Sequence, residues 1–173
     1  MNILQNTGMR ILRQLSLENL IPNLKEFWPR NGPQWDALAK SKDKVFLVEA
    51  KANLPELISP PCGAKSKDSI QRIHSSLLRT KSYLSSTPIE ADWSSDYYQY
   101  TNRISHLYFL RSNGINAYLI FLYFVGDKSV HGPSTIDEWI SAKESMEEFL
   151  KLPSNHKLSD YIIDIFIHVN EII

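Results

Sequence analysis

The stretch that most constrains the fold is a pair of short segments joined by a polar turn. Residues 34–40 have the sequence Gln-Trp-Asp-Ala-Leu-Ala-Lys, and residues 45–51 have the sequence Val-Phe-Leu-Val-Glu-Ala-Lys. The second segment is rich in residues that favour strands. The four residues 41–44 between them have the length of a common hairpin loop. The two segments therefore predict an antiparallel β-hairpin.

The register of this hairpin decides where its charged residues lie. Pairing Lys40 with Val45 across the turn places Asp36 opposite Glu49. Because side chains alternate along a strand, Glu49 and Lys51 then share a face with Asp36. Two carboxylates and an ammonium group therefore converge at one end of an apolar hairpin. Charged groups in such a place need partners or a bound cation, since burying them alone is costly.

The pattern of Asp36, twelve residues, and then Glu49-Ala50-Lys51 resembles the PD-(D/E)xK nuclease superfamily, which has the restriction-endonuclease-like fold. This resemblance implies that Asp36, Glu49 and the backbone carbonyl of Ala50 bind Mg²⁺, or Mn²⁺ in its place. It also implies that Lys51 orients or activates the attacking water. One departure is Trp35, which stands where the family has a proline directly before the aspartate.

Two predicted helices carry supporting candidates. In the helix predicted over residues 97–111, a polar stripe follows the i, i+3, i+4, i+7 spacing and falls on one face; it comprises Gln99, Asn102, Arg103 and His106. The resemblance implies that Gln99 lies beside the active site, and the guanidinium fork of Arg103 suits phosphate oxygens. An exposed polar face is the alternative for this stripe. In the helix predicted over residues 9–27, Glu18 is the candidate for an extra metal ligand, and a solvent-facing Glu18 is the alternative.

The order of predicted elements indicates an α/β domain. Residues 116–125 are almost continuously apolar, which is typical of a strand covered on both faces. The resemblance implies a restriction-endonuclease-like mixed β-sheet flanked by helices on both faces. We expect one domain over residues 1–173, with a nuclease-like core at about 9–126 and a helix-strand extension at about 134–173.

Composition narrows the class of protein. With 43% hydrophobic and 22% charged residues, the chain resembles ordinary soluble proteins, and no apolar run has the length of a membrane span. A single cysteine, Cys62, excludes an internal disulfide and a cysteine-based zinc site. The N-terminus lacks a signal-peptide pattern, so we expect a cytoplasmic protein that does not bind membranes. Residues 1–85 hold 13 Lys and Arg against 7 Asp and Glu, and residues 86–173 hold 6 against 12.

The resemblance implies a magnesium-dependent nuclease. The charge distribution permits this function, because a nucleic-acid enzyme needs a basic face and the basic half of the chain contains the predicted site. We expect nucleic acid as its partner, DNA before RNA. Enzymes of this fold often work as two subunits, so the resemblance is also compatible with a homodimer. The first alternative is a catalytically inactive module of the same fold that binds or regulates. The second is an unrelated α/β protein with a salt-bridged hairpin.

Overall fold

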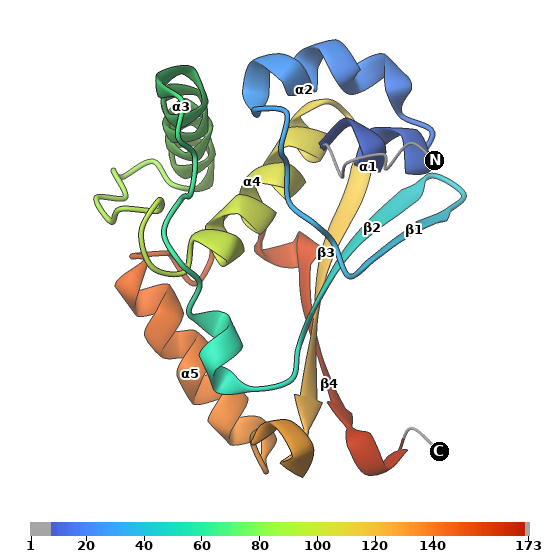
Figure 1. Ribbon diagram of the computed structural model, residues 1–173, viewed down its shortest axis with the longest axis vertical. Coiled ribbons are helices and arrows are strands. Elements are labelled where there is room, and N and C mark those ends of the chain that lie inside the picture. The colour runs from blue at the N-terminus through green and yellow to red at the C-terminus, as the bar shows by residue number, and fades with distance from the viewer. Residues whose placement is uncertain (1–7, 172–173) are drawn as a thin grey trace.

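The computed structural model describes residues 8–171 (Figure 1). Its five α-helices and four strands are α1 (Gly8–Gln14), α2 (Ile21–Phe27), β1 (Ala37–Ser41), β2 (Lys44–Lys51), α3 (Lys67–Leu84), α4 (Tyr98–Ser112), β3 (Asn116–Val125), α5 (Ile136–Phe149) and β4 (Ile162–His168). Five 3₁₀ helices complete the described part, namely η1 (Glu18–Leu20), η2 (Leu54–Leu57), η3 (Lys128–Val130), η4 (Ser159–Tyr161) and η5 (Val169–Glu171).

The strands form one mixed sheet in the order β1-β2-β3-β4, which confirms the predicted α/β class. β1 and β2 are antiparallel, whereas β3 runs parallel to β2 and β4 runs parallel to β3. The hairpin has the predicted register, with Lys40 paired to Val45. Its turn is tighter than predicted, because Ser41 and Lys44 also pair and leave two residues in the loop. Lys42 adopts a left-handed φ of 52° there, as such short hairpin turns require.

The helix predicted over residues 9–27, with Pro22 breaking or restarting it, forms two short helices. α1 ends at Gln14, Ser16 has a left-handed φ of 54°, and η1 intervenes before α2 begins. Pro22 lies in the first turn of α2, where its missing N–H has no helical partner to lose. The proline therefore helps to start a second short helix.

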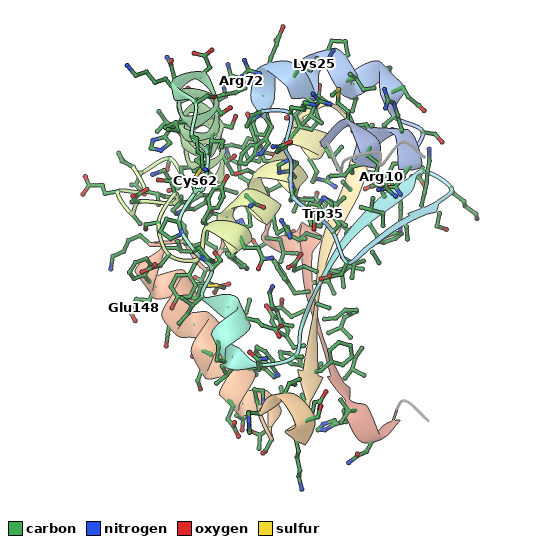
Figure 2. The ribbon with its side chains drawn as sticks, viewed as in Figure 1. Arg10, Lys25, Trp35, Cys62, Arg72 and Glu148 are labelled. Carbon is green, nitrogen blue, oxygen red and sulfur yellow. The ribbon has the colours of Figure 1, made fainter. Side chains whose placement is uncertain are left out.

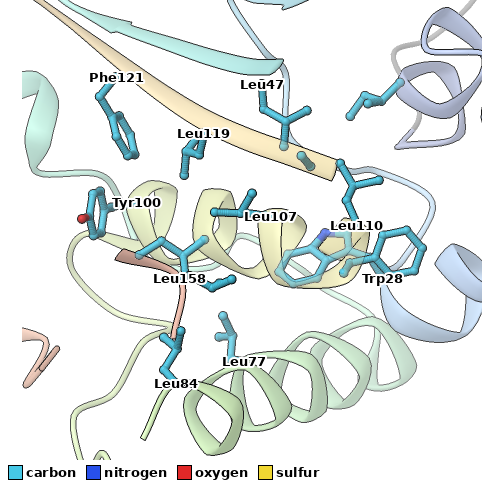
Figure 3. Close-up of a cluster of buried hydrophobic side chains, with 14 of the residues drawn as sticks. Trp28, Leu47, Leu77, Leu84, Tyr100, Leu107, Leu110, Leu119, Phe121 and Leu158 are labelled. Atoms are coloured by element: carbon cyan, nitrogen blue, oxygen red, sulfur yellow. The ribbon is translucent and has the colours of Figure 1, made fainter. Parts of the chain in front are cut away.

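α4 is the central helix of the structure. It packs against β3 on one side and α3 on the other, and most of its residues are buried. Figure 3 shows Leu107 and Leu110 of α4 in one cluster with Leu119 of β3 and Leu77 of α3. This cluster forms the main hydrophobic core and fixes α4 across the sheet.

All five α-helices lie on one face of the sheet (Figure 1). The side chains of β3 alternate strictly between buried and partly exposed along the whole strand. On the partly exposed side, Ile163 and Ile165 of β4 retain 38% and 39% of their accessible surface. Within residues 8–171, no helix covers that face, so the prediction of helices on both faces is wrong. The apolar sequence of residues 116–125 places no charged side chain on either face of the strand, but it does not determine what covers each face.

The C-terminal helix and strand join the same sheet as the hairpin. β4 pairs with β3, and the Trp139 indole of α5 donates a hydrogen bond to the Phe124 carbonyl of β3 at 2.9 Å. Thr135 caps α5 by accepting a hydrogen bond from the Glu138 N–H, as its position before an acidic first turn predicts. Of the helices in the described range, none has the length and apolarity needed to cross a membrane.

Candidate active site

Four predicted site residues meet where β2 ends and α4 begins. Glu49 and Lys51 lie on the face of β2 that is turned toward the helices, and both are buried. Gln99 and Arg103 lie one turn apart in the first half of α4. The alternation predicted for the hairpin and the stripe predicted for the helix therefore bring these four side chains together.

Glu49 lies at the centre of this group and is only 3% exposed. Its Oε1 accepts a hydrogen bond from Lys51 Nζ at 2.8 Å, and its Oε2 accepts one from Arg103 Nε at 2.7 Å. Both cations are also buried, so each contact is a desolvated ion pair. Charge-assisted hydrogen bonds of this length are the strong ones. The carboxylate is thus fixed in one orientation by two elements that are far apart in sequence.

The ammonium group of Lys51 bonds to one side chain of β2 and one side chain of α4. Besides its ion pair with Glu49, its ammonium group donates a hydrogen bond to Gln99 Oε1 at 2.6 Å. Gln99 is in turn anchored through its backbone N–H, which donates to Ser59 Oγ at 2.7 Å. Gln99 therefore lies beside Lys51 and is fixed there by the loop that follows β2.

Each of the three guanidinium nitrogen atoms of Arg103 donates a hydrogen bond to the protein. In addition to Glu49, the guanidinium donates to Asn102 Oδ1 at 2.8 Å and to the Gln34 carbonyl at 2.6 Å. Its Cζ also lies 4.7 Å from the centre of the Trp35 ring, within range of a cation–π interaction. Arg103 therefore positions Glu49 and the segment before β1. This differs from the predicted role, in which its fork faces the phosphates of a substrate.

Asp36 lies at the edge of the group and is exposed. Its Oδ2 accepts a hydrogen bond from the Ala50 N–H at 2.7 Å, and its own N–H donates to the Val48 carbonyl at 3.2 Å. The N–H and C=O of one strand residue point to the same side, so the Ala50 carbonyl is directed toward the edge that holds Asp36. Asp36 lies one residue before β1, and the ladder ends with Ala37 paired to Val48, so the predicted pairing of Asp36 with Glu49 is not part of it.

These donors suit a hard cation in kind. Asp36, Glu49 and the Ala50 carbonyl offer only oxygen atoms, which are the ligands that Mg²⁺ and Mn²⁺ prefer. Asp36 keeps one oxygen, Oδ1, outside the hydrogen bond that anchors Oδ2. In the part of the chain that the structure describes, no three His, Cys, Asp or Glu side chains gather as a metal cluster.

Glu18 is not brought to this group. It is exposed on η1, and η1 contacts α1 and α2. α2 is linked to the C-terminal end of α4 by a hydrogen bond from Asn23 to Asn113, whereas Gln99 and Arg103 lie near the N-terminal end. The prediction of Glu18 as an extra ligand is therefore not supported by its position.

His106 completes the polar stripe of α4, but it lies in an apolar setting. It is surrounded by the rings of Phe27, Trp28 and Trp35. Burial, together with the smaller effect of the nearby Arg103 charge, lowers the pKa of its imidazole to about 4, against the opposing effect of the backbone hydrogen bond. Nδ1 donates that bond to the Asn102 carbonyl at 2.8 Å. The histidine is therefore neutral at pH 7 and serves the packing of α4.

Sequence reasoning missed the supporting role of Trp35. Trp35 lies on the connector that precedes β1 (Figure 2), and the Arg103 guanidinium of α4 lies over its ring. The signal was its position directly before Asp36, which the sequence showed only as a departure from the family pattern. No sequence signal marks Ser59, because it comes from the irregular loop that follows β2.

Comparison of the chain with protein-family models, with curated proteins and with solved structures found no match.

Proposed function

We propose that this protein is a metal-dependent phosphodiesterase that hydrolyses nucleic acid, with DNA favoured over RNA. The observation that carries the proposal is the grouping of Glu49, Lys51 and Gln99, with Asp36 bound to the backbone between the first two. A buried lysine and glutamate on one strand, tied to a helix and adjacent to an exposed carboxylate, provide the parts that the resemblance to PD-(D/E)xK nucleases calls for.

Each residue has a distinct part in this proposal. Asp36, Glu49 and the Ala50 carbonyl would hold Mg²⁺, which supplies polarisation of the phosphate and a lowered pKa of bound water. Lys51 positions the nucleophile and balances negative charge at the phosphorus. Gln99 holds the Lys51 ammonium in place through the 2.6 Å hydrogen bond. Arg103 is a positioning residue, since it acts through Glu49.

A neighbouring groove supports nucleic acid as the substrate. A hollow of about 620 Å³ lies between residues 29–31 and 62–65, and Tyr98, the residue before Gln99, forms part of its wall. Its lining includes Arg30 and Lys65 and no acidic side chain. A concave surface with cations alone favours the phosphate backbone of a strand. The acidic side chains of α5 are not among the residues that line this hollow.

The test is a cleavage assay on single-stranded, double-stranded and flapped DNA and RNA, with Mg²⁺ or Mn²⁺. We expect the wild type to cleave at least one substrate. Lys51→Ala and Asp36→Asn should each lose at least about a hundredfold in rate, because both remove a group that acts at the phosphate. Asn keeps an oxygen that can accept the Ala50 N–H, so Asp36→Asn removes the charge with little change in the backbone.

Lys44→Ala is the matched control, because Lys44 is exposed at the other end of the same strand. It should retain wild-type cleavage. Equal losses in Lys44→Ala and Lys51→Ala would contradict the assignment. Loss of activity together with unfolding, seen by circular dichroism, would make Lys51 a structural residue instead.

A specific observation favours the second candidate function, an inactive module of this fold that binds nucleic acid. Both oxygens of Glu49 already have a cationic partner. Such a module would bind an oligonucleotide but would not cleave it, whichever divalent metal ion is added. Titrating the protein with Mn²⁺ in the presence of the oligonucleotide distinguishes the nuclease and the inactive module from an unrelated protein with a salt-bridged hairpin. Such a protein would bind neither Mn²⁺ nor the oligonucleotide. In that titration, Asp36→Asn should weaken Mn²⁺ binding if the site holds a metal.

A further inference from the structure

The hollow that flanks the candidate active site is walled by separate segments of the chain. Residues 29–31 belong to the connector that leads to β1, and residues 62–65 belong to the loop that follows β2. A third wall is α4, whose first residue, Tyr98, directly precedes Gln99, and the remaining wall is the first part of α3. Because Gln99 binds the Lys51 ammonium group, the hollow adjoins that end of the site. We call it the Tyr98 hollow.

The walls of the Tyr98 hollow are fixed by hydrogen bonds between segments. The Cys62 N–H donates to the Ser94 carbonyl at 2.8 Å, which ties the loop after β2 to the segment before α4. The Arg72 guanidinium donates to the Lys25 carbonyl at 2.6 Å, which ties α3 to the end of α2, just before the connector (Figure 2). A site whose walls are ordered before the ligand arrives avoids the entropy cost of ordering them on binding. The hollow is therefore preformed.

The side chains that line the Tyr98 hollow combine free cations with an aromatic ring. Arg30 and Lys65 are exposed, and neither forms a hydrogen bond or an ion pair with any residue in the described range 8–171. Tyr98 is partly exposed. Burial and the neighbouring Cys62 raise the pKa of its hydroxyl, against a smaller effect of the Arg103 charge, so the hydroxyl is neutral at pH 7. Cations together with a neutral aromatic ring are the means by which proteins bind single strands of nucleic acid.

We propose that the Tyr98 hollow binds an unpaired nucleotide that flanks the scissile phosphate, with the base against the Tyr98 ring and the phosphates near Arg30 and Lys65. The substrate is then a single strand or an unpaired overhang. The volume of about 620 Å³ lies within the range of about 300–1,000 Å³ that small-ligand sites have. A base inside a duplex is paired and stacked, so it enters such a hollow only after it is flipped out. An unpaired base enters without that cost.

The first test compares binding of single-stranded and double-stranded DNA. A fluorescein-labelled oligonucleotide of mixed sequence and its blunt duplex are each titrated with the full chain, and the Kd is read from fluorescence anisotropy. EDTA is present, so neither cleavage nor a bound metal contributes. We expect the single strand to bind at least about tenfold more tightly than the duplex, because only its bases are free to stack on Tyr98.

Variants of the hollow test the role of each side chain in the same titration. Tyr98→Ala should weaken single-strand binding by about 5- to 150-fold, because it removes one base–aromatic stack, whereas Tyr98→Phe keeps the ring and should bind like the wild type. Tyr118→Ala is the matched control, since Tyr118 is partly exposed on the face of the sheet that no described helix covers.

The two cations are tested by the salt dependence of binding. The slope of log K against log salt is about −0.7 for each phosphate contact with a single strand, so Arg30→Ala and Lys65→Ala should each reduce it by about 0.7. Lys44→Ala, at the exposed start of β2, should leave the slope unchanged. Arg30 and Lys65 are exposed, so these variants decide the matter even if Tyr98→Ala unfolds the chain.

This inference rests on the proposed function, because it names the form of nucleic acid that the site receives, but the two can fail separately. Duplex binding as tight as single-strand binding, unchanged salt slopes in both cation variants, or equal losses in Tyr98→Phe and Tyr98→Ala would each overturn the inference, even if the protein cleaves DNA. Single-strand preference with the expected losses, but no cleavage in any divalent metal, would support the inference and overturn the nuclease.

Discussion

Replacing Glu49 with glutamine tests whether the charge of this residue holds the site together. The carboxylate is 3% exposed and accepts two charge-assisted hydrogen bonds, from Lys51 and Arg103, at 2.8 and 2.7 Å. The amide keeps one acceptor oxygen but removes the negative charge. Two buried cations then lack their counter-ion, although Arg103 keeps its bonds to Asn102 and Gln34.

The magnitude follows from the burial of the three groups. Removing one partner of a buried ion pair typically costs about 3–5 kcal/mol. Because glutamine retains one of the two acceptors, we expect the free energy of unfolding to fall by about 3 kcal/mol. For a chain of this size, that change lowers the melting temperature by about 6–12 °C. Urea denaturation followed by circular dichroism measures it directly.

Glu147→Gln is the matched control, because Glu147 also accepts from a lysine, Lys143, at 2.9 Å. That glutamate is 26% exposed, and ion pairs near the surface contribute at most about 1 kcal/mol. The cost of Glu49→Gln should also change little between 0.05 M and 0.5 M salt, since buried pairs are weakly screened. A loss no larger than that of Glu147→Gln, or one that disappears in salt, would refute the view that Glu49 is held by desolvated charges.

Two further predictions concern the surroundings of the site. Burial lowers the pKa of His106 to about 4 from its ordinary 6.5, so the unfolded chain binds the extra proton between these values. Stability should therefore be full above pH 6.5 and fall by up to about 3 kcal/mol as pH falls to 4; His106→Leu should reduce this slope in urea titrations, and an unchanged slope would contradict the assignment. Gly132→Ala should destabilise by about 1–3 kcal/mol, because its Cβ would lie 2.6 Å from the Ala52 carbonyl oxygen. Gly63→Ala meets nothing within 4 Å and should be nearly neutral in the same measurement.

The hairpin and its register could be predicted because both depend on local rules. A short polar turn fixes which residues pair, and the period of two along a strand fixes which side chains share a face. The same holds for α4, where the spacing of Gln99 and Arg103 put both on one stripe. These rules operate within one element or between neighbouring elements, so the sequence is sufficient for them.

The covering of the sheet could not be predicted in this way. Consecutive residues of β3, such as Tyr118 and Leu119, are both apolar, so the sequence does not distinguish the side that helices cover from the side that stays partly exposed. The position of Glu18 could not be predicted for a related reason. The path of the chain through Ser16, η1 and Pro22 sets where that carboxylate lies, and no periodic pattern encodes it.

Arg103 shows why the partner of a charged side chain is harder to infer than its location. Its placement on the site-facing stripe of α4 was predicted, yet its guanidinium binds Glu49 and two groups of the protein. Together with Lys51 it supplies two positive charges against the two negative charges of Asp36 and Glu49, so the described side chains of the site are balanced among themselves. A cation that joins a balanced set gains most when a phosphate group brings further negative charge. For this reason, metal binding by the free protein is a weaker measure of the site than binding or cleavage with nucleic acid present.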